Sequence, residues 1–391
     1  MISSDGAHFN HFRVIFASGG AGEGRVRMKQ IVADRRALHR IPELDRNLKR
    51  TEDYLRASLS PLSCEVFSPI PGSVCAWFDR GVSRAIAFRS DADALPVREQ
   101  TGLDFASEIP GRMHACGHDG HMAMLLELAR RIDRMPSAKH NFLLVFQPAE
   151  ETTGGARDVC ESGIFEKYGV EAIFGMHLWP DLPAGEIASR ENEMMSRSCE
   201  ITAEFTGKSS HIAKAEQGID ALQAGVEFVQ RVRAIEADWP EGIYRLARFG
   251  RMESGSVRNA VSGFTRLEGT LRAFQDEVFY EMLARIRTAA QDVAGETGCT
   301  VRFTTSEGYP AVMNPPELCK RVRDSGIGYQ ELVKPVMITE DFSWYQRSLP
   351  GMFFFLGTGP SPALHSDNFN FDEFVLDAGA DFLEKIALQL N

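Results

Sequence analysis

The chain has 391 residues, of which 43% are hydrophobic and 25% charged, and its formal net charge is −11 from 43 basic and 54 acidic side chains. This length exceeds what one hydrophobic core usually supports, so we expect two domains. An acidic chain without a long basic run argues against nucleic acid or an anionic membrane as a partner, and no apolar stretch reaches the roughly 20 residues of a membrane span.

The N-terminal segment and the cysteines give the next expectations. Residues 1–27 contain one short apolar patch and a Gly-rich stretch, and the patch is shorter than a signal-peptide core of about 7–15 residues. We therefore expect residues 1–27 to be a flexible tail and folding to start near Met28. The seven cysteines are scattered and odd in number. They argue against a disulfide framework and for a reducing compartment, so we predict a cytoplasmic location.

Helices and short strands are predicted first along the chain. Apolar side chains at helical spacing predict a helix over residues 28–39, which ends near Pro42, and a second over residues 44–59. Short strands are predicted at residues 64–67 and 74–78. Four short apolar runs follow at residues 85–88, 142–146, 173–176 and 352–356. Such runs suit strands that are buried on both faces of a sheet.

Each apolar run leads into a polar motif. The motifs are RSDADALP, QPAEE, His177 and, after GTG, His365. Helical stretches at residues 122–132 and 156–162 separate several of the runs, which predicts an α/β layered sheet. In such sheets ligands bind beyond the carboxyl ends of the strands.

A different pattern occupies the middle of the chain. Residues 198–205 and 265–274 alternate apolar and polar side chains, as half-exposed antiparallel strands do. With helices at 218–233 and 278–293 and a strand at 299–305, this is the content of a small α+β sandwich of about four strands and two helices. We expect it to be inserted into the α/β domain, with one domain at 28–190 and 306–391 and the other at 191–305.

Candidate metal ligands gather in four stretches, HACGHDGH (114–121), QPAEE (147–151), GMHLWP (175–180) and ALHSDNF (363–369). Cys, His and Glu are the ligands that borderline-soft divalent cations prefer. Cys116 and His118, flanked by His114 and His121, lie in one turn before a predicted helix. Each alone is more often a buried hydrophobe or a helix cap, but together they favour a metal.

The adjacent carboxylates of Glu150 and Glu151 suggest a catalytic pair. They could be a solvated helix start. However, they follow a buried run and Pro148, and like charges side by side need a cation or a proton. We assign Glu151 as a ligand and Glu150 as the general base. Asp91 and Asp93 are turn residues or groups that orient the ligands.

At these residues the chain resembles the M20 metallopeptidase-like family. Within it the chain is similar to the amidohydrolase branch of hippurate hydrolases, N-acyl-L-amino-acid amidohydrolases and auxin-conjugate hydrolases. The similarity runs from about His39 to the C-terminus through HRIPEL, RSDADALP, HACGHDGH, QPAEE, GKSSH, GTLR, EDFSWY and LHSDNFNFDE. It implies a phosphorylase/hydrolase-like catalytic domain with a mixed sheet and helices on both faces, plus an inserted α+β lid or dimerisation domain.

The resemblance also implies roles for individual residues. A two-metal site maps onto Cys116, His118, Glu151, His177 and His365, with Glu150 as general base. His211 matches a lid histidine that touches the reacting carbonyl, and Asn259 and Arg272 match substrate-binding positions. On simpler interpretations Asn259 is a turn residue and Arg272 a strand-surface charge.

The chain departs from the wider family at three places. Asp91 stands where that family has a metal-binding His in an HxDxxP motif, a replacement typical of this branch, and Ile41 replaces the His of many relatives. The stretch GKSSHIAKAEQGIDA lacks the small-residue and Pro pattern around the lid histidine. This last departure bears on substrate preference.

We therefore expect a metal-dependent amidohydrolase that cleaves N-acyl amino acids, with two divalent ions (Zn, Mn, Co or Ni). If His211 comes from a partner subunit, the enzyme is a homodimer or a higher homo-oligomer. The nearest alternative is a dipeptidase or carboxypeptidase with the same metal core. Two others are a non-catalytic binding protein and a metal-free cysteine hydrolase that uses Cys116.

Overall fold

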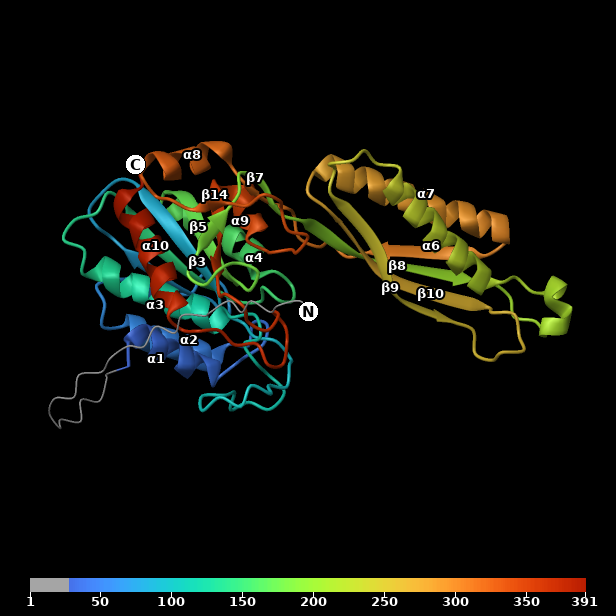
Figure 1. Cartoon of the computed structure of the whole chain (residues 1–391), viewed down its shortest axis with the longest axis horizontal. Helices are drawn as coiled ribbons and strands as arrows, with labels where there is room; N and C mark the ends of the chain where they lie inside the picture. The colour runs from blue at the N-terminus through green and yellow to red at the C-terminus, as the bar shows by residue number, and fades with distance from the viewer. Residues whose placement is uncertain (1–27) are drawn as a thin grey trace, which may run out of the picture.

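The computed structural model describes residues 28–391, so the expected tail at residues 1–27 lies outside the described residues. The chain forms a larger unit around an eight-stranded sheet and a smaller, elongated unit around a four-stranded sheet (Figure 1). Between residues 28 and 391, no helix combines the length and the apolar character that crossing a bilayer requires.

The large sheet is mixed, as expected. Its order is β1-β2-β4-β3-β5-β14-β6-β13. The four central strands, β4, β3, β5 and β14, run parallel, whereas β2 and β6 pair antiparallel to β4 and β14. The strands are β1 (Glu65–Phe67), β2 (Val74–Phe78), β3 (Ala85–Asp91), β4 (Asn141–Gln147), β5 (Val170–Trp179), β6 (Ile187–Ser189), β13 (Gln330–Glu331) and β14 (Gly351–Gly357).

Helices cover both faces of this sheet. Successive side chains of its buried strands point to opposite sides, so both faces carry apolar side chains that the helices bury. Phe354 of β14 packs into the core beneath one helical layer, whereas Phe353 and Phe355 pack into the core beneath the other. One layer contains α1 (Gln30–His39), α2 (Lys49–Leu59), α3 (His118–Asp133), α8 (Pro316–Asp324) and α10 (Val375–Gln389). The other contains α4 (Gly155–Glu161), α5 (Ile164–Lys167) and α9 (Ser343–Ser348).

The smaller unit is an α+β sandwich with the strand order β11-β8-β10-β9, all antiparallel. The alternation seen in the sequence places Ile201, Ala203 and Phe205 in a core with Phe228 and Ile286 of the two helices. Its elements are β8 (Arg197–Thr206), the 3-10 helix η1 (Ile212–Gln217), α6 (Ala221–Ala237), β9 (Arg245–Ser254), β10 (Phe264–Ala273), α7 (Asp276–Thr297) and β11 (Thr300–Thr305). The expected content of four strands and two helices is confirmed.

A short two-stranded sheet lies where the chain passes between the units. It pairs β7 (Asn192–Met195) with β12 (Val312–Asn314). The smaller unit thus interrupts the larger one in sequence, while the domain limits at 190/191 and 305/306 stay a prediction.

Candidate active site

The predicted metal ligands converge at the carboxyl ends of the central strands of the large sheet. Ligand atoms of Cys116, His118 and Glu151 lie within 4.8 Å of one another. The Nε2 atom of His177 lies 3.4 Å from Cys116 Sγ, and Nε2 of His365 lies 3.4 Å from Glu151 Oε1. His177 lies inside β5, two residues before its end, and His365 lies in the loop after β14.

A glycine starts the helix that carries His118. Gly117 has a φ of 84°, in the left-handed region that favours glycine. A Cβ atom there would lie 2.9 Å from Leu178 Cδ1. Cys116 and His118 therefore flank a tight turn that presses against β5, which brings both side chains next to His177.

The ligand set fits a divalent cation. The Nδ1–H of His118 donates to the backbone oxygen of Asp93 at 2.8 Å, which leaves the lone pair on Nε2. This Nε2 and Glu151 Oε1 are buried without hydrogen-bond partners, 3.8 Å apart. Buried polar atoms are seldom left unpaired in native proteins, and a cation between these two atoms would satisfy both.

Local electrostatics also suit a metal. Burial lowers the pKa of His118, and it lowers the pKa of His177 well below its usual range, so both imidazoles are neutral ligands at neutral pH. Burial, with the charges of Glu151 and Glu150, raises the pKa of the Cys116 thiol well above its usual range. A bound cation reverses this effect, because it stabilises the thiolate.

Glu150 is positioned by its own backbone. The preceding residue, Ala149, has a φ of 60°, a strained conformation for a residue other than glycine. This turn aims the N–H groups of Glu150 and Glu151 at the Asp93 carboxylate, at 3.0 and 3.2 Å. Burial and the nearby carboxylate of Glu340 raise the pKa of Glu150 well above its usual range. A carboxyl group of raised pKa suits proton transfer near neutral pH.

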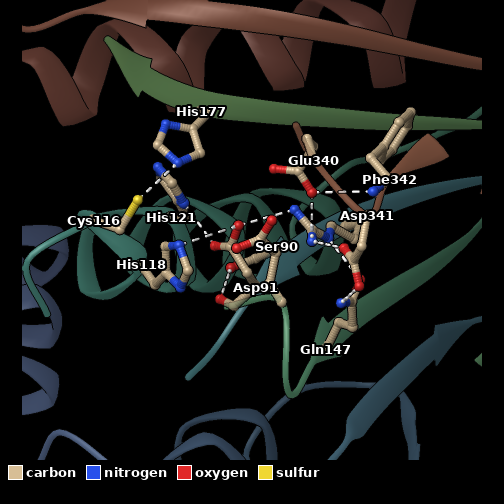
Figure 2. A network of polar contacts seen from close by, with 12 residues as sticks. Ser90, Asp91, Cys116, His118, His121, Gln147, His177, Glu340, Asp341 and Phe342 are labelled. Carbon is tan, nitrogen blue, oxygen red and sulfur yellow. Dashed lines mark hydrogen bonds and ion pairs between the residues drawn. The ribbon is translucent and has the colours of Figure 1, made fainter. Parts of the chain in front are cut away.

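A buried guanidinium was missed by the sequence analysis. Arg89 in β3 donates to Asp91 Oδ2 at 2.9 Å, to Asp341 Oδ1 at 2.7 Å and to Gln147 Oε1 at 2.8 Å. Figure 2 shows the three acceptor residues, Asp91, Asp341 and Gln147. Its Nη2 also lies 2.9 Å from Glu340 Oε1. Carboxylate oxygens of Glu340 and Asp341 lie within 4.8 Å of that of Glu150. The single positive charge of Arg89 thus offsets part of the negative charge of Asp91, Glu340 and Asp341.

The two flanking histidines of HACGHDGH differ in their surroundings. His121 lies among Asp91, His118 and His177, but both of its ring nitrogens already have hydrogen-bond partners. His114 belongs to none of the ligand groups found among residues 28–391, and its ring centroid lies 6.5 Å from that of His39. Burial lowers the pKa of His114 to about 3.

The candidate catalytic groups line a cavity of about 660 Å³ between the two units. Its walls include Cys116, Glu150, Glu151, His177 and His365, the aromatic side chains of Trp179, Tyr309 and Trp344, and Arg272 from β10. Arg272 is half-buried, and its Nη1 donates to the backbone oxygen of Met337. In the described part of the chain, no carboxylate forms an ion pair with Arg272.

His211 and Asn259 are not part of this cavity. They lie together in the smaller unit, where the N–H of Ile212 donates to the backbone oxygen of Asn259 at 2.9 Å and residue 211 forms a β-bridge with Ala260. His211 is exposed, and η1, which follows it, lies at the end of the smaller unit that points away from the large sheet (Figure 1). Of the three predicted substrate-binding residues, only Arg272 lines the cavity that holds the ligand cluster.

The fold and the site together define a metal-dependent hydrolase. The family model described as peptidase family M20/M25/M40 matches residues 87–389. The chain belongs to this family, and its cluster of buried Cys116 and His118 with half-buried Glu151 can hold divalent metal ions.

Relatives agree with this assignment. An uncharacterized hydrolase of Staphylococcus haemolyticus is 33% identical over 374 residues, which cover 92% of this chain and 97% of the relative. The crystal structure of the Bacillus subtilis YXEP protein, a dinuclear metal binding peptidase from the M20 family, is similar with a TM-score of 0.79 and 31% identity, over 91% of this chain and 96% of that one. A crystal structure from methicillin resistant Staphylococcus aureus has a TM-score of 0.86 at 26% identity, with the same coverage of both chains.

Proposed function

We propose that the chain is an amidohydrolase that cleaves the amide bond of N-acyl amino acids, releasing a carboxylic acid and a free amino acid. The supporting observation is that Arg272, a half-buried cation without an ion-pair partner in the described chain, lines the same cavity as Glu150 and the ligand cluster. An arginine in this setting favours a substrate with a carboxylate. The carboxylate of an amino acid, adjacent to its acylated nitrogen, meets this requirement.

The chain's own residues divide the work between binding and proton transfer. Cys116, His118, Glu151, His177 and His365 would hold two divalent ions (Zn, Mn, Co or Ni). When bound, such ions would supply Lewis acidity that lowers the pKa of water. Glu150 accepts the proton of the attacking water and returns it to the departing nitrogen. Arg272 holds the carboxylate, which orients the amide for attack.

We also propose that the active form is a homodimer, with His211 and Asn259 entering the site of a second copy. The shallow depression beside these residues is lined by Ile212, Leu222 and Val257, which are 52%, 45% and 59% exposed. The neighbouring β9 is an edge strand of its sheet. Exposed apolar side chains next to an open sheet edge favour association. Sedimentation analysis of the purified chain tests this; a monomer that is fully active would contradict it.

A substrate panel on metal-reconstituted protein tests the activity. We expect hydrolysis of N-acetyl and N-benzoyl amino acids, with a chelator removing the activity and metal restoring it. Benzoylglycine and benzoylglycinamide form a matched pair, since they differ only in the carboxylate assigned to Arg272. A much lower kcat/KM for the amide is expected in the wild type. An Arg272→Met variant should hydrolyse the two compounds at similar rates.

The panel also separates the alternatives. Faster hydrolysis of dipeptides than of any N-acyl amino acid would favour a dipeptidase, the nearest alternative because the similar Bacillus subtilis protein is described as a peptidase. Activity that resists chelators would favour a cysteine hydrolase that uses Cys116. Bound metal without turnover on any substrate would favour a binding protein.

A further inference from the structure

His121 bridges two of the elements that carry candidate metal ligands. It lies on the first turn of α3, three residues after His118, and side chains at this spacing lie on one helix face. The His121 ring centroid is 5.4 Å from that of His118 and 4.6 Å from that of His177. Position alone therefore makes His121 a candidate ligand.

The hydrogen bonds of His121 fix its tautomer. The N–H of Leu178 donates to His121 Nε2 at 2.9 Å, so Nε2 carries the lone pair. The ring proton is then on Nδ1, which donates to Asp91 Oδ1 at 2.6 Å. Neither nitrogen of His121 has a lone pair left for a cation.

The strand geometry explains why Leu178 needs this acceptor. β5 pairs with β3 only as far as Gly175, opposite Arg89, and then continues alone on that side to Trp179. Leu178 is fully buried, so water cannot replace the missing strand. His121 Nε2 serves as the acceptor that β3 no longer provides.

The same residue of β5 orients the next ligand. The Nδ1–H of His177 donates to the backbone oxygen of Leu178 at 2.6 Å, which leaves the lone pair of His177 on Nε2. That Nε2 faces Cys116 Sγ at 3.4 Å. Asp91, His121, the backbone of Leu178 and His177 thus form a continuous series of hydrogen bonds that ends at a ligand atom.

We infer that His121 is a positioning residue: it holds the backbone of Leu178, and through it the tautomer and orientation of His177, without binding a metal itself. This inference rests on the proposed function of the site. Loss of a partner that orients a metal ligand typically lowers metal affinity by about 10–100-fold. The same-sized loss is expected here for the ion that His177 would hold.

Two conservative variants separate the hydrogen bonds of His121. The amide of Gln reaches about where Nε2 lies, so His121→Gln keeps an acceptor for the N–H of Leu178. The amide of Asn lies closer to Nδ1, so His121→Asn keeps a donor to Asp91 but loses the acceptor. His121→Ala removes both. His140→Gln is the matched control, because His140 is a buried histidine outside the ligand cluster, with its Nε2 at 3.5 Å from Glu171 Oε1.

Zinc affinity, measured by competition with a chromophoric chelator, and the absorption spectrum of the Co²⁺-loaded protein are the readouts. We expect affinity close to wild type for His121→Gln and His140→Gln, and about 10–100-fold weaker affinity for one ion in His121→Asn and His121→Ala. At saturating Co²⁺, all variants should bind the wild-type number of ions with an unchanged ligand-field spectrum. Thermal unfolding of the metal-free variants checks that each one folds. If His121→Ala does not fold, the comparison of His121→Gln with His121→Asn still tests the inference.

Two results would overturn the inference. Wild-type affinity in both His121→Asn and His121→Ala would mean that the hydrogen bonds of His121 do not support the site. Loss of one ion at saturating metal in all three variants, Gln included, as in His177→Ala, would make His121 a ligand. If the wild-type protein binds no metal, the proposed function is refuted instead. The wild-type measurement shows this before any variant is compared.

Discussion

The carboxylate of Asp93 accepts the backbone N–H of Glu150, with 3.0 Å between Asp93 Oδ1 and the Glu150 nitrogen. Its other oxygen accepts the N–H of Glu151. Asp93 also offers its backbone oxygen to the ring of His118. Asp93, two residues after the end of β3, therefore connects the candidate base to two candidate ligands. It holds a strand end, a tight turn and a helix start in one geometry.

Glu150→Gln should separate binding from turnover. Glutamine keeps the shape and the backbone bond to Asp93 but cannot accept a proton, so we expect kcat to fall by about 10²–10⁴-fold. Metal content, measured by mass spectrometry, should stay at the wild-type level because Glu150 is not assigned as a ligand. Glu200→Gln is the control, since Glu200 lines the same cavity but is exposed. Normal turnover in Glu150→Gln would refute the base assignment.

Arg89→Met should destabilise the chain strongly. Its guanidinium lies among the carboxylates of Asp91, Glu340 and Asp341, and its side chain is 1% exposed. Removing one partner of a buried ionic group leaves unpaired charge and typically costs about 3–5 kcal/mol. Urea unfolding of the metal-free protein measures this cost.

The exposed ion pair of Arg157 and Glu307 provides the matched control for Arg89. These side chains are 44% and 70% exposed. Arg157→Met should therefore cost about 1 kcal/mol or less. Equal losses in the two variants would show that the Arg89 network contributes no more than a surface pair.

The sequence predicted the strands that form the site, because continuous apolar runs need two covered faces and the motifs follow those runs directly. It could not predict the role of Arg89, since the contact with Asp341 joins residues 252 positions apart. The only local signal was the spacing of Arg89 and Asp91, which places two charged side chains on the same face of a buried strand. β9 was not assigned for a related reason: its sequence RLARFGRMES is polar, and pairing with β10 holds it in the sheet.

Within HACGHDGH, the residue types alone could not tell ligands from neighbours. The helix start at His118 turns His118 and His121 towards β5, whereas His114 is buried near His39. Similarly, the sequence placed His211 and Asn259 with the substrate site only by resemblance, and within one chain they lie outside the cavity. Distances between units and between copies are not encoded in local patterns.

His39 should make stability depend on pH. Burial alone would lower its pKa, but bonds from its ring to Asp119 at 2.8 Å and Glu99 at 3.2 Å raise it to about 9, from an ordinary value of 6.5. A group with a raised pKa in the folded state stabilises it fully below about pH 6.5, and this contribution is lost as the pH rises through about 9. The pKa shift of His39 corresponds to a contribution of about 3 kcal/mol to the free energy of unfolding.

The measurement for His39 is the free energy of unfolding of metal-free wild type and His39→Gln between pH 6 and pH 9.5. The advantage of the wild type should shrink as the pH rises. His140 gives the opposite case, because burial lowers its pKa. The stability of the wild type relative to His140→Gln should therefore be constant above about pH 6.5 and shrink as the pH falls below it. A flat profile for His39 would contradict its charged state in the fold.

Mixing two inactive variants tests whether His211 acts in a second copy. His211→Ala removes the residue that we propose enters the partner's site, and Glu150→Gln removes the base of its own site. Each should be nearly inactive alone. In a mixed dimer, the site that keeps Glu150 receives an intact His211 from the other chain, so random mixing restores about one quarter of the wild-type activity. Mixing after unfolding and refolding, followed by a kcat measurement, gives the result.

The control for this complementation keeps both changes in one chain. A double variant with His211→Ala and Glu150→Gln, mixed with wild type, forms mixed dimers in which neither site has both groups, so activity should fall below the wild-type fraction present. If His211 instead acted on the cavity of its own chain, mixing the two single variants would restore nothing. We do not expect this second outcome. In the described part of the chain, Glu150 belongs to the larger unit and His211 to the smaller one, and His211 does not line the cavity that contains Glu150.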